Sequence, residues 1–141
     1  MTFVCNSLAA KAQSVAEIEA KLARRGVPAA EAAAVVVAAR RLGYLDDAEL
    51  AGQLARGHRA RGYGLRRAMQ ALRRRGVPEP LAEEALETVY GEADEDALAR
   101  SALGSRRTDD DPSRRRAASF LVRRGFSPGA AWRAVRNTRA P

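Results

Sequence analysis

The sequence predicts an all-α protein made of three tandem three-helix repeats, similar to helix-turn-helix units, in an elongated, curved array. Hydrophobic residues make up 46% of the 141 residues but aromatic residues only 5%. Much of the apolar content is therefore alanine, which has the highest helix propensity. A Leu-x-Arg-Arg-Gly-apolar motif also occurs three times, at 22–27, 72–77 and 121–126. Repetition with a period of about fifty residues is typical of stacked helical units.

Each copy of this motif is predicted to end a helix. Arginines in a last helical turn interact favourably with the negative end of the helix dipole. The glycine that follows can adopt the left-handed backbone conformation found just past a helix, at Gly26, Gly76 and Gly125. A proline two or three residues later suits the first turn of the next helix.

The helix before each motif is predicted from apolar residues at helical spacing, such as Val15, Ile18 and Leu22 in the first copy. Ser14 and Glu17 form a capping-box pattern at its start. A further helix opens the second copy at Asp46 or Asp47. The first copy has only part of this opening helix, so the predicted repeats are 1–43, 44–91 and 92–141.

Two further structural expectations concern the spaces between these elements. We expect the bulkiest side chains near the predicted boundaries to plug the spaces between repeats, namely Tyr44, Leu45, Tyr90 and Trp132. We expect the acidic run 109–111 to form a loop between helices.

The charge is divided between segments. There are 25 Lys and Arg residues against 17 Asp and Glu, a formal net charge of +8. The stretch 56–75 contains many arginines and no acidic residue, whereas 79–96 is acidic with no basic residue. This segregation predicts a basic face, strongest in the middle repeat, for an anionic partner. The alternative is a solvated arginine-rich face with no partner.

Catalysis and membrane insertion are not expected. The only histidine, His58, falls on the apolar side of its helix, and Cys5 has no second cysteine with which to form an internal disulfide. No phosphate-binding glycine loop or nucleophile elbow is found. The alanine-valine stretch 29–39 is too short to span a bilayer, and no secretory leader is recognised. We therefore expect a cytoplasmic monomer with no catalytic residue, metal or cofactor.

The segments 43–51 (GYLDDAELA), 61–67 (RGYGLRR) and 72–77 (LRRRGV), in this order and spacing, resemble the RecX family of bacterial regulatory proteins. The resemblance covers roughly residues 4–136. It implies a protein of DNA repair, recombination and the SOS response. Such a protein binds the RecA recombinase filament on single-stranded DNA and lowers ATP hydrolysis, strand exchange and co-protease activity.

The resemblance also suggests which residues contact RecA or DNA. Positions that match the family motif are Arg61, Tyr63, Arg66, Arg67 and Arg74. Arg24 and Arg123 are the repeat equivalents of Arg74. Tyr63 has two interpretations that the sequence does not separate, because its ring can stack on a base or plug the junction of two helices.

Two other functions compete with the RecA regulator. The first is a direct, nonspecific DNA-binding protein of helix-turn-helix type, against which the acidic block 79–96 argues by repulsion. The second is an adaptor whose positive face serves only solubility. The adaptor predicts no salt-sensitive partner, whereas the other two functions do.

Overall fold

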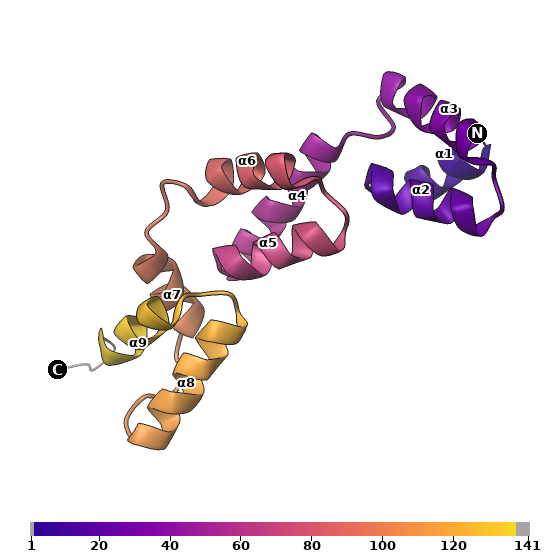
Figure 1. Cartoon of the computed structure of the whole chain (residues 1–141). Coiled ribbons are helices and arrows are strands. Elements are labelled where there is room, and N and C mark those ends of the chain that lie inside the picture. Colours follow the sequence, from indigo (N-terminus) through magenta and orange to yellow (C-terminus); the bar gives the residue numbers. More distant parts are fainter. Residues whose placement is uncertain (1, 138–141) are drawn as a thin grey trace.

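The computed structural model describes residues 2–137, which contain nine α-helices and no strand. The prediction of an all-α fold is confirmed. In Figure 1 the helices follow one another along an elongated molecule in three successive groups. The helices are α1 (Thr2–Ala10), α2 (Val15–Arg24), α3 (Ala29–Arg41), α4 (Asp47–Ala60), α5 (Leu65–Arg74), α6 (Glu79–Tyr90), α7 (Glu95–Leu103), α8 (Asp111–Arg123) and α9 (Pro128–Asn137).

The buried side chains form three separate clusters, one for each group of helices. We name the groups the first unit (α1–α3), the second unit (α4–α6) and the third unit (α7–α9). Ile18 and Leu22 lie in the first cluster, Leu72 in the second, and Leu121 and Phe126 in the third. Alanines at zero exposure occur in all three clusters, so the helices pack closely through small side chains.

The predicted helix ends are present at the expected residues. Gly26, Gly76 and Gly125 have φ of 75°, 78° and 103°, a backbone conformation that residues with a Cβ rarely adopt. Ser14 and Glu17 make the complete capping box at the start of α2. These features depend on residues only a few positions apart, so the sequence alone was sufficient to predict them.

Most of the acidic run 109–111 lies in a loop between helices, as predicted, and only Asp111 belongs to a helix. Asp110 is the N-cap of α8, where its carboxylate accepts a hydrogen bond of 2.7 Å from the Ser113 backbone N–H, and Asp111 is the first residue of the helix. An aspartate at this position satisfies a backbone donor that has no partner within the helix.

The expectation that bulky side chains fill the spaces between repeats was wrong. Tyr44 is 52% exposed and Trp132 is 37% exposed. Leu45 is buried in the core of the first unit and Tyr90 in that of the second. The boundaries at 43/44 and 91/92 stay predictions, and the packing of Leu45 places this residue with the helices that precede it.

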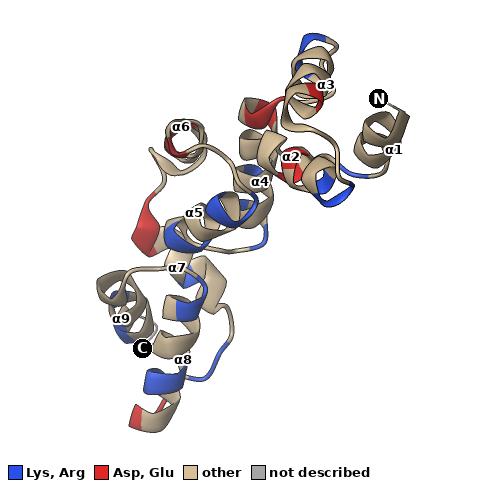
Figure 2. Ribbon diagram, turned by 45° about the vertical axis from the view of Figure 1, so that its right-hand side comes forward, with Lys and Arg blue, Asp and Glu red and all other residues tan. Residues whose placement is uncertain are grey.

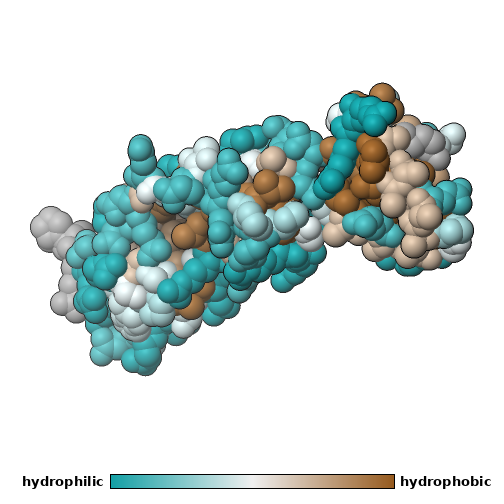
Figure 3. Space-filling view, turned by 45° about the horizontal axis from the view of Figure 1, so that its top comes forward, coloured by the Kyte–Doolittle hydropathy of each residue, from teal (hydrophilic) through white to brown (hydrophobic). Residues whose placement is uncertain are grey.

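The visible surface differs between the units. Hydrophilic side chains cover most of the second and third units in Figure 3, whereas apolar side chains gather on the first. Val37 of α3 and Leu42, which follows this helix, are 55% and 62% exposed. No helix within residues 2–137 has both the length and the apolar character needed to cross a bilayer.

Candidate interaction surface

The second and third units meet through two turns. The backbone N–H of Gly64, before α5, donates to the Arg124 carbonyl at 2.8 Å, and the Arg66 N–H donates to the Gly125 carbonyl at 3.2 Å. A Cβ on Gly64 would lie 2.6 Å from the Gly125 carbonyl oxygen. Glycine is therefore required where the two backbones touch.

Two guanidinium groups lie against the Tyr63 ring at this junction. The Arg124 guanidinium carbon is 4.2 Å from the ring centroid and that of Arg67 is 4.8 Å away. Arg124 also donates hydrogen bonds to the carbonyls of Arg61 and Gly62. This placement favours the interpretation of Tyr63 as a plug between helices over that of a ring free to stack on a base.

Tyr90 supports the same turn from the core of the second unit. Its hydroxyl donates a hydrogen bond of 2.9 Å to the Tyr63 carbonyl. Burial raises the pKa of Tyr90 to about 12, with the charge of Arg59 acting in the opposite direction. The phenol therefore stays protonated, as a donor must, throughout the physiological pH range.

The first and second units meet through the equivalent turns. The Ser14 hydroxyl, before α2, donates to the Arg75 carbonyl at 2.5 Å. Arg75 makes two hydrogen bonds of 2.9 and 3.0 Å to the Glu17 carboxylate and one of 2.8 Å to the Ala12 carbonyl. Burial alone would raise the pKa of Glu17, but hydrogen bonds from Arg75 and from the Ser14 backbone outweigh it and lower the pKa.

Both junctions therefore share one geometry. The turn that ends the second helix of a unit contacts the start of the second helix of the preceding unit, and the arginine immediately before the glycine makes the principal contacts. The sequence motifs alone do not indicate this role of Arg75 and Arg124. The available signal was the final arginine of the repeated motif, which also occurs as Arg25, where the guanidinium lies 3.9 Å from the Phe3 ring centroid within the first unit.

The predicted binding residues divide into two sets. Tyr63 and Arg67 lie at the junction of the second and third units, where Arg67 donates to the Arg123 carbonyl at 3.0 Å. The side chains of the others are exposed and form no ion pair within the described part of the chain: Arg24, Arg61, Arg66, Arg74 and Arg123. Of these, Arg24, Arg74 and Arg123 lie in the last turns of α2, α5 and α8, which are blue at these ends in Figure 2.

The acidic segment lies beside this basic surface. In Figure 2 acidic residues mark α6 and the segment that leads to α7. One arginine of α5, Arg73, pairs with Glu79 at 2.6 Å, and the hydrogen bond from Arg73 lowers the pKa of Glu79. Both side chains are largely exposed, so this pair adds little stability. It does remove Arg73 from the arginines available to a partner.

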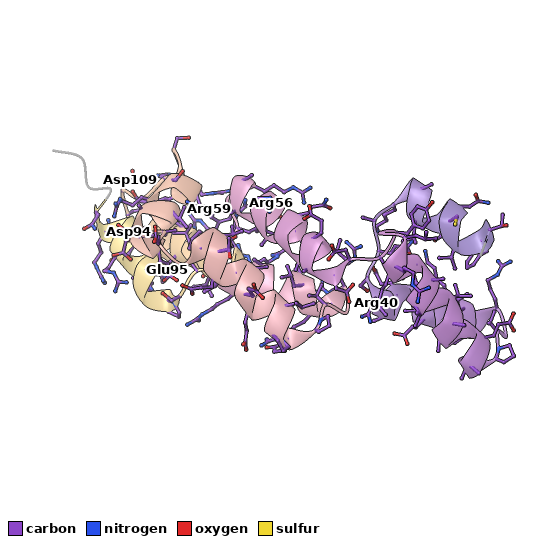
Figure 4. The ribbon with its side chains drawn as sticks, turned by 90° about the horizontal axis from the view of Figure 1, so that it is seen from above. Arg40, Arg56, Arg59, Asp94, Glu95 and Asp109 are labelled. Carbon is purple, nitrogen blue, oxygen red and sulfur yellow. The ribbon has the colours of Figure 1, made fainter. Side chains whose placement is uncertain are left out.

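Several labelled side chains in Figure 4 belong to other faces of the molecule. Arg56 and Arg59 project from α4, while Asp94 and Glu95 lie at the start of α7. Arg56 lies 3.8 Å from Glu49, and Arg59 donates to the Val89 carbonyl. These arginines already have partners on their own unit.

The one histidine contacts neighbouring residues of its own unit. The His58 Nδ1 lies 3.0 Å from the Leu54 carbonyl oxygen, and its ring centroid is 5.3 Å from that of Tyr63. Among residues 2–137, no three His, Cys, Asp or Glu side chains are grouped so that they could hold a metal ion. The geometry points to an interaction surface made of exposed arginines.

The chain is similar to known proteins along most of its length. The family model for the second three-helix domain of RecX matches residues 46–86. The regulatory protein RecX of Thermus thermophilus is 39% identical, covering 96% of this chain and 89% of that protein. The RecX protein of Mycobacterium sp. strain JLS is 33% identical, covering 88% of this chain and 73% of that protein.

The RecX protein of Deinococcus radiodurans is longer than this chain. It is 35% identical over 96% of this chain, which spans 66% of that relative. The likeness to all three relatives extends well beyond the second unit. The resemblance seen in the motifs is thus confirmed, and the chain belongs to the RecX family of regulatory proteins.

Proposed function

We propose that this chain binds the RecA filament on single-stranded DNA and inhibits RecA ATP hydrolysis, strand exchange and co-protease activity. The observation that carries the proposal is the equivalent placement of Arg24, Arg74 and Arg123 in three successive units. Each side chain is exposed and has no ion-pair partner among the described residues. Cations at regular intervals suit a partner that is itself a repeating array, because each can contact a successive subunit.

A direct DNA-binding protein is the second candidate. The exposed arginines favour it, because guanidinium groups bind phosphates well. The acidic helix α6 lies beside them, and its negative charge weakens association with a polyanion. A regulator that contacts protein and also touches the enclosed strand accommodates both observations.

The test is ATP hydrolysis by the cognate RecA on single-stranded DNA, with this protein added far below one molecule per RecA. We expect strong inhibition by the wild type and loss of inhibition with Arg24, Arg74 and Arg123 all changed to Ala. The matched control changes Arg40, Arg56 and Arg136 to Ala, which removes the same charge from other exposed positions. The control should inhibit like the wild type.

Two results would contradict the proposal. The first is wild-type protein that leaves ATP hydrolysis unchanged while it still retards bare DNA on a gel, which favours the direct DNA-binding function. The second is equal loss of inhibition in both triple variants, which assigns the effect to net charge.

A further inference from the structure

We infer that a hollow on the third unit binds the phosphate backbone of a single-stranded nucleic acid. The hollow has a volume of about 620 Å³ and lies along α8 and the turn that precedes this helix. The inference rests on the proposed function and deepens it, since it assigns contact with the strand inside the filament to one unit. The charge pattern of the sequence instead predicts a basic face that is strongest in the middle repeat.

The lining of the hollow is cationic. It contains five arginines, the hydroxyls of Ser113 and Ser119, and no carboxylate: Arg106, Arg107, Arg115, Arg116 and Arg123. Arg115 and Arg123 are eight residues apart on one helix, a rise of about 12 Å. That length accommodates more than one phosphate group of a strand. The hollow therefore suits an extended polyanion better than a single small anion.

The acidic residues nearby pair with Arg107 and Arg114 and form no ion pair with the other arginines of the helix. Asp109 and Asp110 pair with Arg107, and Asp111 pairs with Arg114. The hydrogen bond from Arg107 lowers the pKa of Asp109, so this carboxylate stays charged and paired. The ion pairs of the run 109–111 are thus made with Arg107, before α8, and with Arg114, in its first turn.

The remaining arginines of the helix form no ion pair within residues 2–137, although the charge of Arg116 helps to lower the pKa of Asp110. Arg115 and Arg123 are exposed, and Arg116 donates only to the Ser113 hydroxyl at 3.2 Å. An arginine that pairs with no acid is available to phosphate oxygens without first breaking an ion pair. Binding at this hollow therefore replaces water and counterions around these guanidiniums.

Phe120 restricts what the hollow recognises. The Arg106 guanidinium carbon lies 3.5 Å from the Phe120 ring centroid, and that of Arg124 lies 5.3 Å away. The ring is partly buried beneath these groups, so it orients Arg106 and is not a free platform for a base. Recognition is by phosphate and independent of base sequence.

The first experiment measures binding to a fluorescently labelled oligothymidylate by anisotropy, without RecA, over a series of salt concentrations. The variant changes Arg115 and Arg116 to Ala, which leaves Arg24, Arg74 and Arg123 intact. The matched control changes Arg100 and Arg136 to Ala, two exposed arginines of the third unit that do not line the hollow. Both variants lose the same charge.

We expect the hollow variant to bind about tenfold more weakly, with the slope of log affinity against log salt reduced by about 1.4. The control should keep the wild-type slope. Failure of the wild type to bind the oligonucleotide, or equal weakening in both variants, would overturn the inference.

Competition distinguishes the source of the negative charge. Unlabelled oligonucleotide should displace the probe at concentrations where inorganic phosphate and polyglutamate have no effect. Displacement by polyglutamate, at a carboxylate concentration equal to the phosphate concentration of the effective oligonucleotide, would instead assign the hollow to an acidic protein surface. Because RecA is absent, a protein that binds the strand but fails to inhibit ATP hydrolysis refutes the proposed function and leaves this inference standing.

Discussion

The two junctions of the molecule use one geometry and different chemistry. At the first–second junction Arg75 binds a carboxylate, that of Glu17. At the second–third junction Arg124 lies against aromatic rings and donates to backbone carbonyls. The apolar packing also differs, since Leu98 of α7 packs against both the second and third cores. The repeated motif therefore specifies where one unit contacts the next, whereas residues outside the motif determine the strength of that contact.

The largest expected effect is a loss of stability when a glycine at a junction is replaced, compared with a glycine that has no neighbour within 4 Å. In Gly125→Ala the new Cβ would lie 2.5 Å from the Arg67 backbone nitrogen, and the residue would keep a φ of 103°. Strain and overpacking together should cost about 3–5 kcal/mol. Gly26→Ala is the matched control, because its φ is 75° but nothing lies within 4 Å, and it should cost about 1 kcal/mol. Denaturant unfolding measures both, and equal costs would show that the junction does not hold Gly125.

A smaller effect should distinguish the two arginines. Arg124→Lys keeps the charge but loses the planar group that lies against Tyr63 and donates to two carbonyls, so we expect a loss of about 1–2 kcal/mol. Arg75→Lys can still pair with Glu17, although it loses the bidentate geometry and the hydrogen bond to the Ala12 carbonyl, so we expect a smaller loss. Hydrogen exchange at the Gly64 amide, which donates to the Arg124 carbonyl, reports on the second–third junction directly. Similar losses from the two substitutions would refute the proposed difference in chemistry.

The smallest effect is a pH dependence confined to the first–second junction. The pKa of Glu17 is lowered in the folded protein, so its contribution is present above its ordinary value of 4.5 and is lost as pH falls through the folded value. We expect the free energy of unfolding to fall by less than about 1 kcal/mol over this pH interval, because the Arg75–Glu17 pair is partly exposed.

The part of the pH dependence that comes from the first–second junction should be absent in Glu17→Gln. Hydrogen exchange at the Arg66 amide, at the other junction, serves as the internal control and should not respond in the same pH interval. A pH response of equal size in Glu17→Gln would assign it to other carboxylates.

Local features of this fold were predictable and distant contacts were not. The capping box of Ser14 and Glu17 spans three residues, and the glycine turns follow directly from their motif, so sequence rules apply to both. Arg75 and Glu17 lie 58 residues apart, and helical periodicity does not indicate which side chains meet across that separation. The same limit applies to Tyr44, which is large enough to fill a junction but is exposed.

In the candidate site, too, local features were predictable and contacts between distant residues were not. The sequence predicted a basic face in the middle repeat, because the stretch 56–75 contains many arginines and no acidic residue. It did not separate Arg67, which contacts the third unit, from Arg66, which does not use its side chain there. Nor did it indicate that the acids of the run 109–111 pair with Arg107 and Arg114 and leave Arg115 without a carboxylate. The roles of the predicted binding residues stay predictions.

The separation of the three cores has a mechanical consequence. Bending at a junction strains a few hydrogen bonds, one arginine contact and, between the second and third units, the packing of Leu98, whereas bending within a unit would open a core. Stiffness is therefore high within each unit and low between units, and it is lowest at the first–second junction, where no apolar residue in the described range packs against both cores. A chain built in this way bends most easily between its first and second units, so its first unit is the part that adjusts most easily.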